Sequence, residues 1–134
     1  MASNTLDLTG IWDGLYRYKD VPDAAPATPF LATIKETSGA FTGTVLEPHE
    51  FDDLTIGATI HGRRDMCDSQ FAKDYETDDE YYRETVQYRG TLSEDGEMIT
   101  GEWSIGHWAG TFEMTRELGA SEALAEKVSV AVKL

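Results

Sequence analysis

The stretch Ile99-Thr100-Gly101-Glu102-Trp103-Ser104-Ile105-Gly106-His107-Trp108-Ala109-Gly110-Thr111-Phe112 contains one five-residue pattern twice: an apolar residue, any residue, glycine, any residue, and a second apolar residue. In an extended chain, residues two apart share a face. The apolar side chains and glycines of each copy therefore lie together, with polar residues opposite. A short turn containing Gly106 joins the copies. The stretch predicts an antiparallel hairpin with one apolar face and one solvent-exposed face.

The same pattern recurs four more times along the chain. Three of these copies end in an apolar residue and one ends in a charge: Leu8-Thr9-Gly10-Ile11-Trp12, Phe41-Thr42-Gly43-Thr44-Val45, Tyr88-Arg89-Gly90-Thr91-Leu92 and Ile60-His61-Gly62-Arg63-Arg64. A glycine beside a large side chain on one strand face is typical of a tightly curved sheet, where small and large residues alternate. The six copies together predict a small closed β-barrel.

Alternating polarity marks eight strands, at about residues 8–19, 30–37, 40–46, 55–64, 70–76 and 83–92 and in the two halves of the 99–116 hairpin. Their order favours an all-β, antiparallel, up-and-down barrel. In the tail, Ser121 precedes a run of good helix formers, which predicts a short C-terminal helix packed outside the barrel. We expect one domain over residues 1–134, with the barrel at about 8–116 and the tail at 117–134.

Composition limits the partners and the compartment. The chain has 134 residues, enough for one core, and a formal net charge of −14. That charge disfavours nucleic acid and anionic membranes as partners, and it also serves solubility. Cys67 is the single cysteine, so no intrachain disulfide forms and a reducing compartment is expected. Neither a signal peptide nor a membrane-spanning run is recognisable, so we expect a cytoplasmic protein.

The segments Leu8-Thr9-Gly10-Ile11-Trp12 and Phe41-Thr42-Gly43, with the succession of glycine–aromatic strands, resemble the calycin superfamily of lipocalins, fatty-acid-binding proteins and avidins. Among these, the motifs and the length are most similar to the avidin-like barrels. The resemblance covers roughly residues 8 to 116 and implies that Trp12 closes one end of the barrel. Avidins hold biotin with an Asn and a Ser after the early Trp. Gly14 and Tyr18 stand near those places here, so biotin binding is not expected.

Arg64 is the sharpest candidate for a functional residue. It ends the one copy of the pattern that does not close with an apolar side chain, on the face predicted to point inward. A guanidinium inside a barrel needs a partner, because an unpaired buried charge is very unfavourable. The partner is either a carboxylate of the protein or an anionic ligand held by two hydrogen bonds. Alternatively, the strand bends at Gly62 and Arg64 is solvated at the rim.

Aromatic residues complete the predicted ligand site. Tyr16, Tyr18 and Tyr88 fall in the inward phase, and Tyr75 does so if its strand is placed correctly. Phenol groups facing a lumen orient a ligand or act as general acids, or they belong to ordinary core packing. Trp103 and Trp108 either line a pocket or form aromatic core. The predicted ligand-binding residues are Arg64, Tyr16, Tyr18, Tyr88, Trp103 and Trp108.

The remaining chemistry-bearing residues do not form a recognisable site. His49, His61 and His107 lack a second ligand at zinc-site spacing, and the acidic runs do not match a calcium loop. Cys67 has no neighbouring base in the sequence. The chain has no nucleophile elbow, phosphate loop or dinucleotide fingerprint. We therefore expect neither a metal nor a cofactor.

Three classes of function remain open. The leading hypothesis is a binding protein that holds a largely apolar small molecule with a polar or anionic head in the lumen, met by Arg64 and the tyrosines. The alternative is a cofactor-independent lyase, isomerase or cyclase, with a lumen tyrosine for proton transfer and Arg64 for oxyanion stabilisation. The third is a protein-interaction or inhibitor module acting through the acidic loops. An eight-stranded barrel can be filled or just hollow. The oligomeric state is also left open, a homo-oligomer included.

Overall fold

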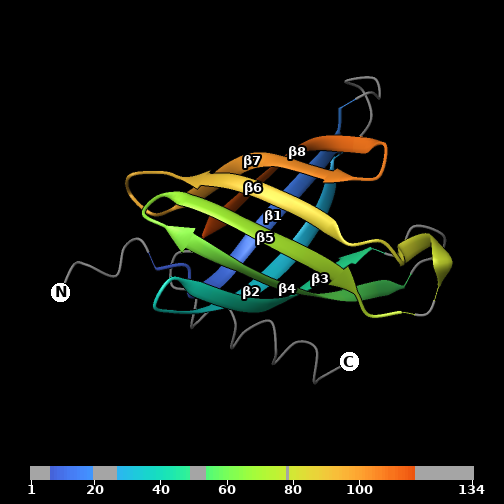
Figure 1. Cartoon of the computed structure of the whole chain (residues 1–134), viewed down its shortest axis with the longest axis horizontal. Helices are drawn as coiled ribbons and strands as arrows, with labels where there is room; N and C mark the ends of the chain where they lie inside the picture. The colour runs from blue at the N-terminus through green and yellow to red at the C-terminus, as the bar shows by residue number, and fades with distance from the viewer. Residues whose placement is uncertain (1–6, 20–26, 49–53, 78, 117–134) are drawn as a thin grey trace.

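The computed structural model describes residues 7–19, 27–48, 54–77 and 79–116. It contains eight strands and a short 3₁₀ helix: β1 Gly10–Tyr18, β2 Thr28–Thr37, β3 Ala40–Pro48, β4 Thr55–Asp65, β5 Asp68–Tyr75, η2 Glu80–Tyr82, β6 Val86–Leu92, β7 Met98–Ile105 and β8 Trp108–Arg116. Each strand pairs antiparallel with the next, and β8 pairs with β1 (Figure 1). The predicted eight-stranded antiparallel barrel is confirmed. The predicted C-terminal helix lies outside the described residues.

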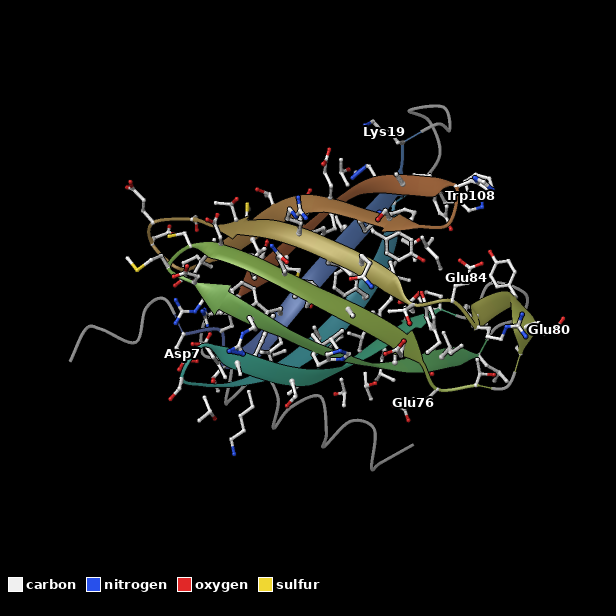
Figure 2. All side chains as sticks on the ribbon, in the orientation of Figure 1. Asp7, Lys19, Glu76, Glu80, Glu84 and Trp108 are labelled. Carbon is white, nitrogen blue, oxygen red and sulfur yellow. The ribbon has the colours of Figure 1, made fainter. Side chains whose placement is uncertain are left out.

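The two ends of the barrel differ. Tight connections follow β2, β4 and β6, at the end where β1 begins and β8 finishes; we call this the turn end. Strands β1, β3, β5 and β7 finish at the opposite end, where η2 also lies; we call this the loop end. Figure 2 shows Asp7 at the turn end, and Trp108, Glu80 and Glu84 at the loop end. Because successive strands run in opposite directions, a residue late in β1 and a residue late in β4 lie at opposite ends.

Trp12 closes the turn end, as predicted. Its side chain is 0% exposed, and its indole Nε1 donates a hydrogen bond of 2.9 Å to the Leu8 carbonyl oxygen. The guanidinium of Arg116 lies 4.3 Å from the centre of the Trp12 ring. The same guanidinium donates to the carbonyl oxygens of Asp7 and Thr9, at 2.7 and 2.8 Å. These contacts fix the segment before β1 across this end of the barrel.

Two glycines, Gly110 in the repeated pattern and Gly14 outside it, lie beside large rings, as expected for a tightly curved sheet. Gly14 pairs across the strands with Phe30, and a Cβ atom on Gly14 would overlap the Phe30 ring. Gly110 pairs with Trp103, and a Cβ atom there would overlap the indole. The absent side chains leave room for the aromatic side chains that fill the lumen.

The middle of the lumen is packed with aromatic rings. Phe71 and Tyr88 stack with their centroids 4.7 Å apart and an interplanar angle of 4°. Phe112 meets both rings edge-on, at 5.9 and 5.1 Å. Aliphatic side chains such as Val45 and Met114 surround these rings in the core. The barrel is therefore largely filled between its two ends.

Candidate functional site in the lumen

Five polar side chains meet inside the loop-end half of the barrel, and we call them the lumen cluster. They come from four strands: Tyr16 on β1, Glu47 on β3, Lys73 and Tyr75 on β5, and Tyr88 on β6. Each takes its place from strand alternation. Glu47 follows the buried Phe41 and Val45 on one face of β3, and Lys73 follows Ser69 and Phe71 on β5.

Glu47 is the acceptor at the centre of the cluster. Its Oε1 atom accepts hydrogen bonds from the hydroxyl groups of Tyr75, at 2.7 Å, and Tyr16, at 3.2 Å. Its Oε2 atom accepts a hydrogen bond of 2.8 Å from the Lys73 ammonium. Both carboxylate oxygens are therefore engaged, and the residue is only 3% exposed.

Lys73 is equally buried, at 3% exposure, and aromatic rings surround its ammonium. The Nζ atom lies 4.6 Å from the centre of the Tyr75 ring and 5.4 Å from the centres of the Tyr16 and Tyr88 rings. A buried lysine is unusual unless it is paired, and here its partners are one carboxylate and phenol groups.

The protonation states in the cluster follow from these contacts. Burial, reinforced by the Glu47 carboxylate, raises the pKa of Tyr16 and Tyr75 well above the ordinary value. Burial also raises the pKa of Tyr88, although the Lys73 ammonium opposes this. Burial acts to lower the pKa of Lys73, but the negative charges of Tyr88, once it is ionised, and of Glu47 outweigh this effect and the net pKa is raised. At neutral pH the three phenols are therefore protonated and Lys73 is a cation.

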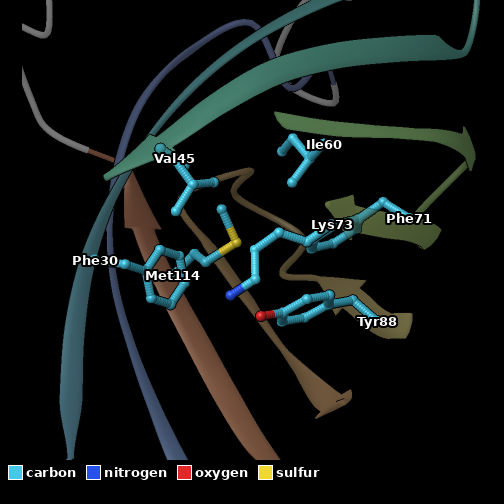
Figure 3. Close-up of a pocket in the computed structure, with 8 residues that line it drawn as sticks. Phe30, Val45, Ile60, Phe71, Lys73, Tyr88 and Met114 are labelled. Atoms are coloured by element: carbon cyan, nitrogen blue, oxygen red, sulfur yellow. The ribbon is translucent and has the colours of Figure 1, made fainter. Parts of the chain in front are cut away.

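A small cavity borders the cluster. Figure 3 shows the Lys73 ammonium and the Tyr88 hydroxyl pointing toward one another beside Met114 and Phe30. The cavity has a volume of about 10 Å³, and its other lining residues are apolar: Ala32, Val45, Ile60 and Phe71. This volume is about that needed to hold one water molecule. The cavity therefore offers one small polar position in an otherwise apolar surrounding.

An aromatic group lies next to the cluster at the loop end. The Tyr18 ring meets Trp103 edge-on at 4.9 Å and Trp108 edge-on at 5.6 Å. Trp103 is buried and its Nε1 donates to the Arg17 carbonyl oxygen at 3.2 Å. Trp108 is 56% exposed, so it lies at the rim and not in the core. The predicted residues Tyr16, Tyr18, Tyr88, Trp103 and Trp108 thus all belong to the cluster or to this neighbouring group.

Arg64 is not brought together with them. It lies near the end of β4, at the turn end, whereas Tyr18 ends β1 at the loop end. Its Nε and Nη2 atoms donate to the two carboxylate oxygens of Glu36, at 2.7 and 2.6 Å, and its Nη1 atom donates to the Met66 carbonyl oxygen. The hydrogen bond to Glu36 raises the pKa of Arg64. Of the alternatives for its partner, the structure shows the protein carboxylate.

Sequence reasoning missed Glu47 and Lys73, although alternation carries a signal for both. Glu47 lies two residues after the inward Val45, but the predicted strand ended at residue 46. Lys73 lies between Phe71 and Tyr75 on one face, and a lysine in an aromatic stripe is a recognisable exception. Glu36 likewise continues the inward face of Ala32 and Ile34. An acidic residue and a basic residue that both fall on the inward face of their strands therefore predict a buried ion pair.

The rest of the described chain adds no metal site. Within the described ranges, no group of three or more His, Cys, Asp or Glu side chains is placed to hold a metal ion. Over the same residues, no helix has the length and apolar character needed to cross a membrane.

Comparison with known proteins supports the fold alone. No family model matches the chain, and no curated protein matches it. Among solved structures, it is similar to a redesigned β-barrel, with 12% identity, a TM-score of 0.68 and coverage of 87% of this chain and 96% of the other. It is also similar to a de novo designed, fluorescence-activating β-barrel, with 11% identity, a TM-score of 0.56 and coverage of 87% and 100%. The class defined here is a closed, antiparallel, eight-stranded β-barrel. The calycin resemblance stays a prediction.

Proposed function

We propose that this barrel is a small-molecule binding protein whose ligand engages the lumen cluster and the neighbouring aromatic group. The observation that carries the proposal is the Lys73–Glu47 ion pair, placed with three phenol groups beside a cavity inside the barrel. Buried ion pairs are weak devices for stability, because well-packed apolar residues of similar volume stabilise a core as well or better. A polar cluster in this position supports recognition of a ligand.

The cavity and its lining support a ligand with a polar head and a largely apolar body. One position beside Lys73 and Tyr88 fits a group the size of a water molecule, such as a hydroxyl or carbonyl oxygen. The lumen beyond it is filled by Phe71, Phe112 and their neighbours, so the apolar body packs at the loop end against Tyr18, Trp103 and Trp108.

The charge balance favours an uncharged head over an anionic one. Lys73 is already paired with Glu47, and Arg64 is held by Glu36 and the Met66 carbonyl oxygen at the other end. An anion bound in the lumen would therefore compete with a carboxylate of the protein for either cation. A neutral group that accepts or donates one hydrogen bond meets no such competition.

The tyrosine protonation states favour binding over the enzyme alternative. The raised pKa of Tyr16, Tyr75 and Tyr88 keeps these phenols protonated at neutral pH, so they are poor general bases, and it also makes them weaker general acids than an ordinary tyrosine. Tyr16 and Tyr75 already donate their hydroxyl protons to Glu47. An interaction module would leave the interior cluster without a role.

The test uses an uncharged, environment-sensitive dye, Nile red, with fluorescence as the readout of binding. We expect saturable binding by the native protein and its loss in the double variant Lys73→Met/Glu47→Gln. That variant removes both charges of the pair and keeps most of the volume. The matched control is Arg64→Met/Glu36→Gln, which alters the ion pair at the turn end and should bind the dye normally. Native mass spectrometry of the protein from its own host then identifies the natural ligand.

Two results would contradict the proposal. One is the absence of saturable dye binding together with a native mass spectrum that shows only the unliganded chain. The other is unchanged binding in the Lys73→Met/Glu47→Gln variant, since the cluster would then have no part in recognition.

A further inference from the structure

The ammonium of Lys73 occupies a cage formed by other residues. Three phenol rings have their centres 4.6 to 5.4 Å from the Nζ atom, and the Glu47 carboxylate lies 2.8 Å away. Rings at this distance attract a cation through their negative faces, and a carboxylate adds a direct charge-assisted hydrogen bond. We propose that Tyr16, Tyr75, Tyr88 and Glu47 form a binding site for alkylammonium ions, whose native occupant is the tethered side chain of Lys73.

The walls of the cage are held by contacts that do not involve Lys73. The Tyr88 ring is stacked on Phe71 and meets Phe112 edge-on. The Tyr75 ring lies 4.7 Å from that of Tyr82, and the Tyr16 ring lies 5.8 Å from Trp103. The hydroxyl groups of Tyr16 and Tyr75 orient the Glu47 carboxylate. The cage therefore keeps its shape when the lysine side chain is shortened.

The charge left behind sets the specificity of the vacated site. Without Lys73, the Glu47 carboxylate is a buried anion with two neutral phenol donors, which is strongly unfavourable unless a cation replaces the ammonium. A neutral molecule of the same size fills the space but leaves this charge unpaired. The site thus selects a primary ammonium carried on a short apolar chain.

This inference does not depend on the proposed function, because it concerns the place that Lys73 fills and not the natural ligand. In the native protein the cage is already occupied, so free alkylammonium ions should not stabilise the fold. The turn end provides a contrast, because there a guanidinium satisfies Glu36 through two hydrogen bonds.

The experiment truncates the Lys73 side chain and then adds the missing group as a free small molecule. Lys73→Ala deletes the atoms equivalent to propylammonium, which is protonated at neutral pH. We expect propylammonium to raise the unfolding temperature of Lys73→Ala saturably, and to bind about tenfold or more tightly than 1-propanol, a neutral molecule of matched length. The native protein, Lys73→Ala/Glu47→Gln and Arg64→Ala should show no comparable rise.

Each alternative result decides against the inference. Equal stabilisation by 1-propanol means that the compounds only fill space. An equal response of Arg64→Ala or of Lys73→Ala/Glu47→Gln means that the cage and its carboxylate do not select the cation. If Lys73→Ala is unfolded alone, circular dichroism is followed during the propylammonium titration. Recovery of the strand spectrum then supports the inference, and failure to recover it at any concentration overturns the inference.

Discussion

Arg64 and Glu36 are joined by two parallel hydrogen bonds, of 2.7 and 2.6 Å, at the turn end of the barrel. The Glu36 side chain is 3% exposed and that of Arg64 is 16% exposed, so a buried carboxylate is paired directly with a largely buried guanidinium. Glu36 also accepts a hydrogen bond from the Leu8 backbone N–H, which ties the pair to the segment that closes the end.

We predict that Arg64→Met destabilises the barrel, because it leaves the Glu36 carboxylate buried without its cation. The expected loss is about 3 kcal/mol of unfolding free energy, measured by urea denaturation. Arg64→Met/Glu36→Gln should recover a large part of this loss. An unchanged denaturation midpoint in Arg64→Met would mean that the pair has no structural role.

We predict that the buried carboxylate of Glu47 likewise depends on the ammonium of Lys73 in the lumen cluster. Lys73→Met alone should cost about 3 to 5 kcal/mol, since it strands Glu47, and adding Glu47→Gln should restore much of the stability. Glutamine keeps an oxygen that accepts from Tyr16 and Tyr75. The measurement is a double-mutant cycle in urea. Additive effects of the two substitutions would show that the charges do not interact.

The lumen cluster also predicts a loss of stability at alkaline pH. The pKa values of Tyr16, Tyr75 and Tyr88 are raised above 10.0 in the folded chain, so the unfolded chain loses these protons first. Stability is therefore complete below pH 10.0 and falls above it, by about 1.4 kcal/mol per pH unit for each tyrosine. The raised pKa of Lys73 acts in the same direction above its ordinary value of 10.5.

Urea denaturation on both sides of pH 10.0 tests this, with tyrosinate absorbance to count the ionised phenols. Tyr88→Phe removes one of the three groups and should make the alkaline slope shallower. A free energy of unfolding that does not change across this range would contradict the burial of the phenols.

We predict that Trp12→Ala costs about 3 to 5 kcal/mol, the range for an enclosed large aromatic. The substitution removes a 0% exposed side chain, its hydrogen bond to Leu8 and the surface on which Arg116 lies. The matched control is Trp108→Ala at the rim, where 56% exposure limits the expected loss to about 1 kcal/mol. Equal denaturation midpoints for the two variants would show that Trp12 does not close the turn end.

We predict that replacing glycine by alanine destabilises the barrel more at Gly101 than at Gly14. A Cβ atom at Gly101 would overlap backbone atoms of Arg89 and Gly90, which cannot move without breaking strand pairing. The atoms nearest to a Cβ atom at Gly14 would be those at the far end of the Phe30 ring, a side chain that can shift more easily than backbone. Gly101→Ala should therefore reach or exceed about 3 kcal/mol, with Gly14→Ala nearer 1 kcal/mol. The reverse order in thermal denaturation would contradict the packing shown.

The fold was predictable because a strand face has a period of two residues, and the glycine pattern kept that period visible in six places. The same reasoning gave the face on which Trp12 lies, whereas its place at one end of the barrel was implied by the resemblance to the avidin-like barrels. The grouping of Arg64 with Tyr16, Tyr18 and Tyr88 did not follow, because alternation gives the face of a residue but not its height along the barrel axis. Height depends on strand direction and cross-strand register, which place Arg64 opposite Ser69 near the turn end.

The contacts within the lumen cluster are a second feature that could not be predicted from the sequence. The inward phase of Lys73 is readable from Phe71 and Tyr75, but its carboxylate partner lies on β3, which is not paired with β5. Contacts across a lumen depend on how the whole sheet curves, and no local pattern encodes them. Whether the predicted aromatic residues contact a ligand stays a prediction.

The joining of β1 to β8 has a consequence for the order of folding. Arg116 bonds to the carbonyl oxygens of Thr9 and Asp7, which lie 107 and 109 residues earlier in the chain, whereas every other strand pairing is between sequence neighbours. We expect loop-closure entropy to make the β1–β8 pairing the slowest to form, so the seven pairings between sequence neighbours can assemble while the outer edges of β1 and β8 are still unpaired. Until then, both carry unpaired backbone groups that invite association with a second chain. The interval before ring closure is the period in which this protein is most exposed to aggregation.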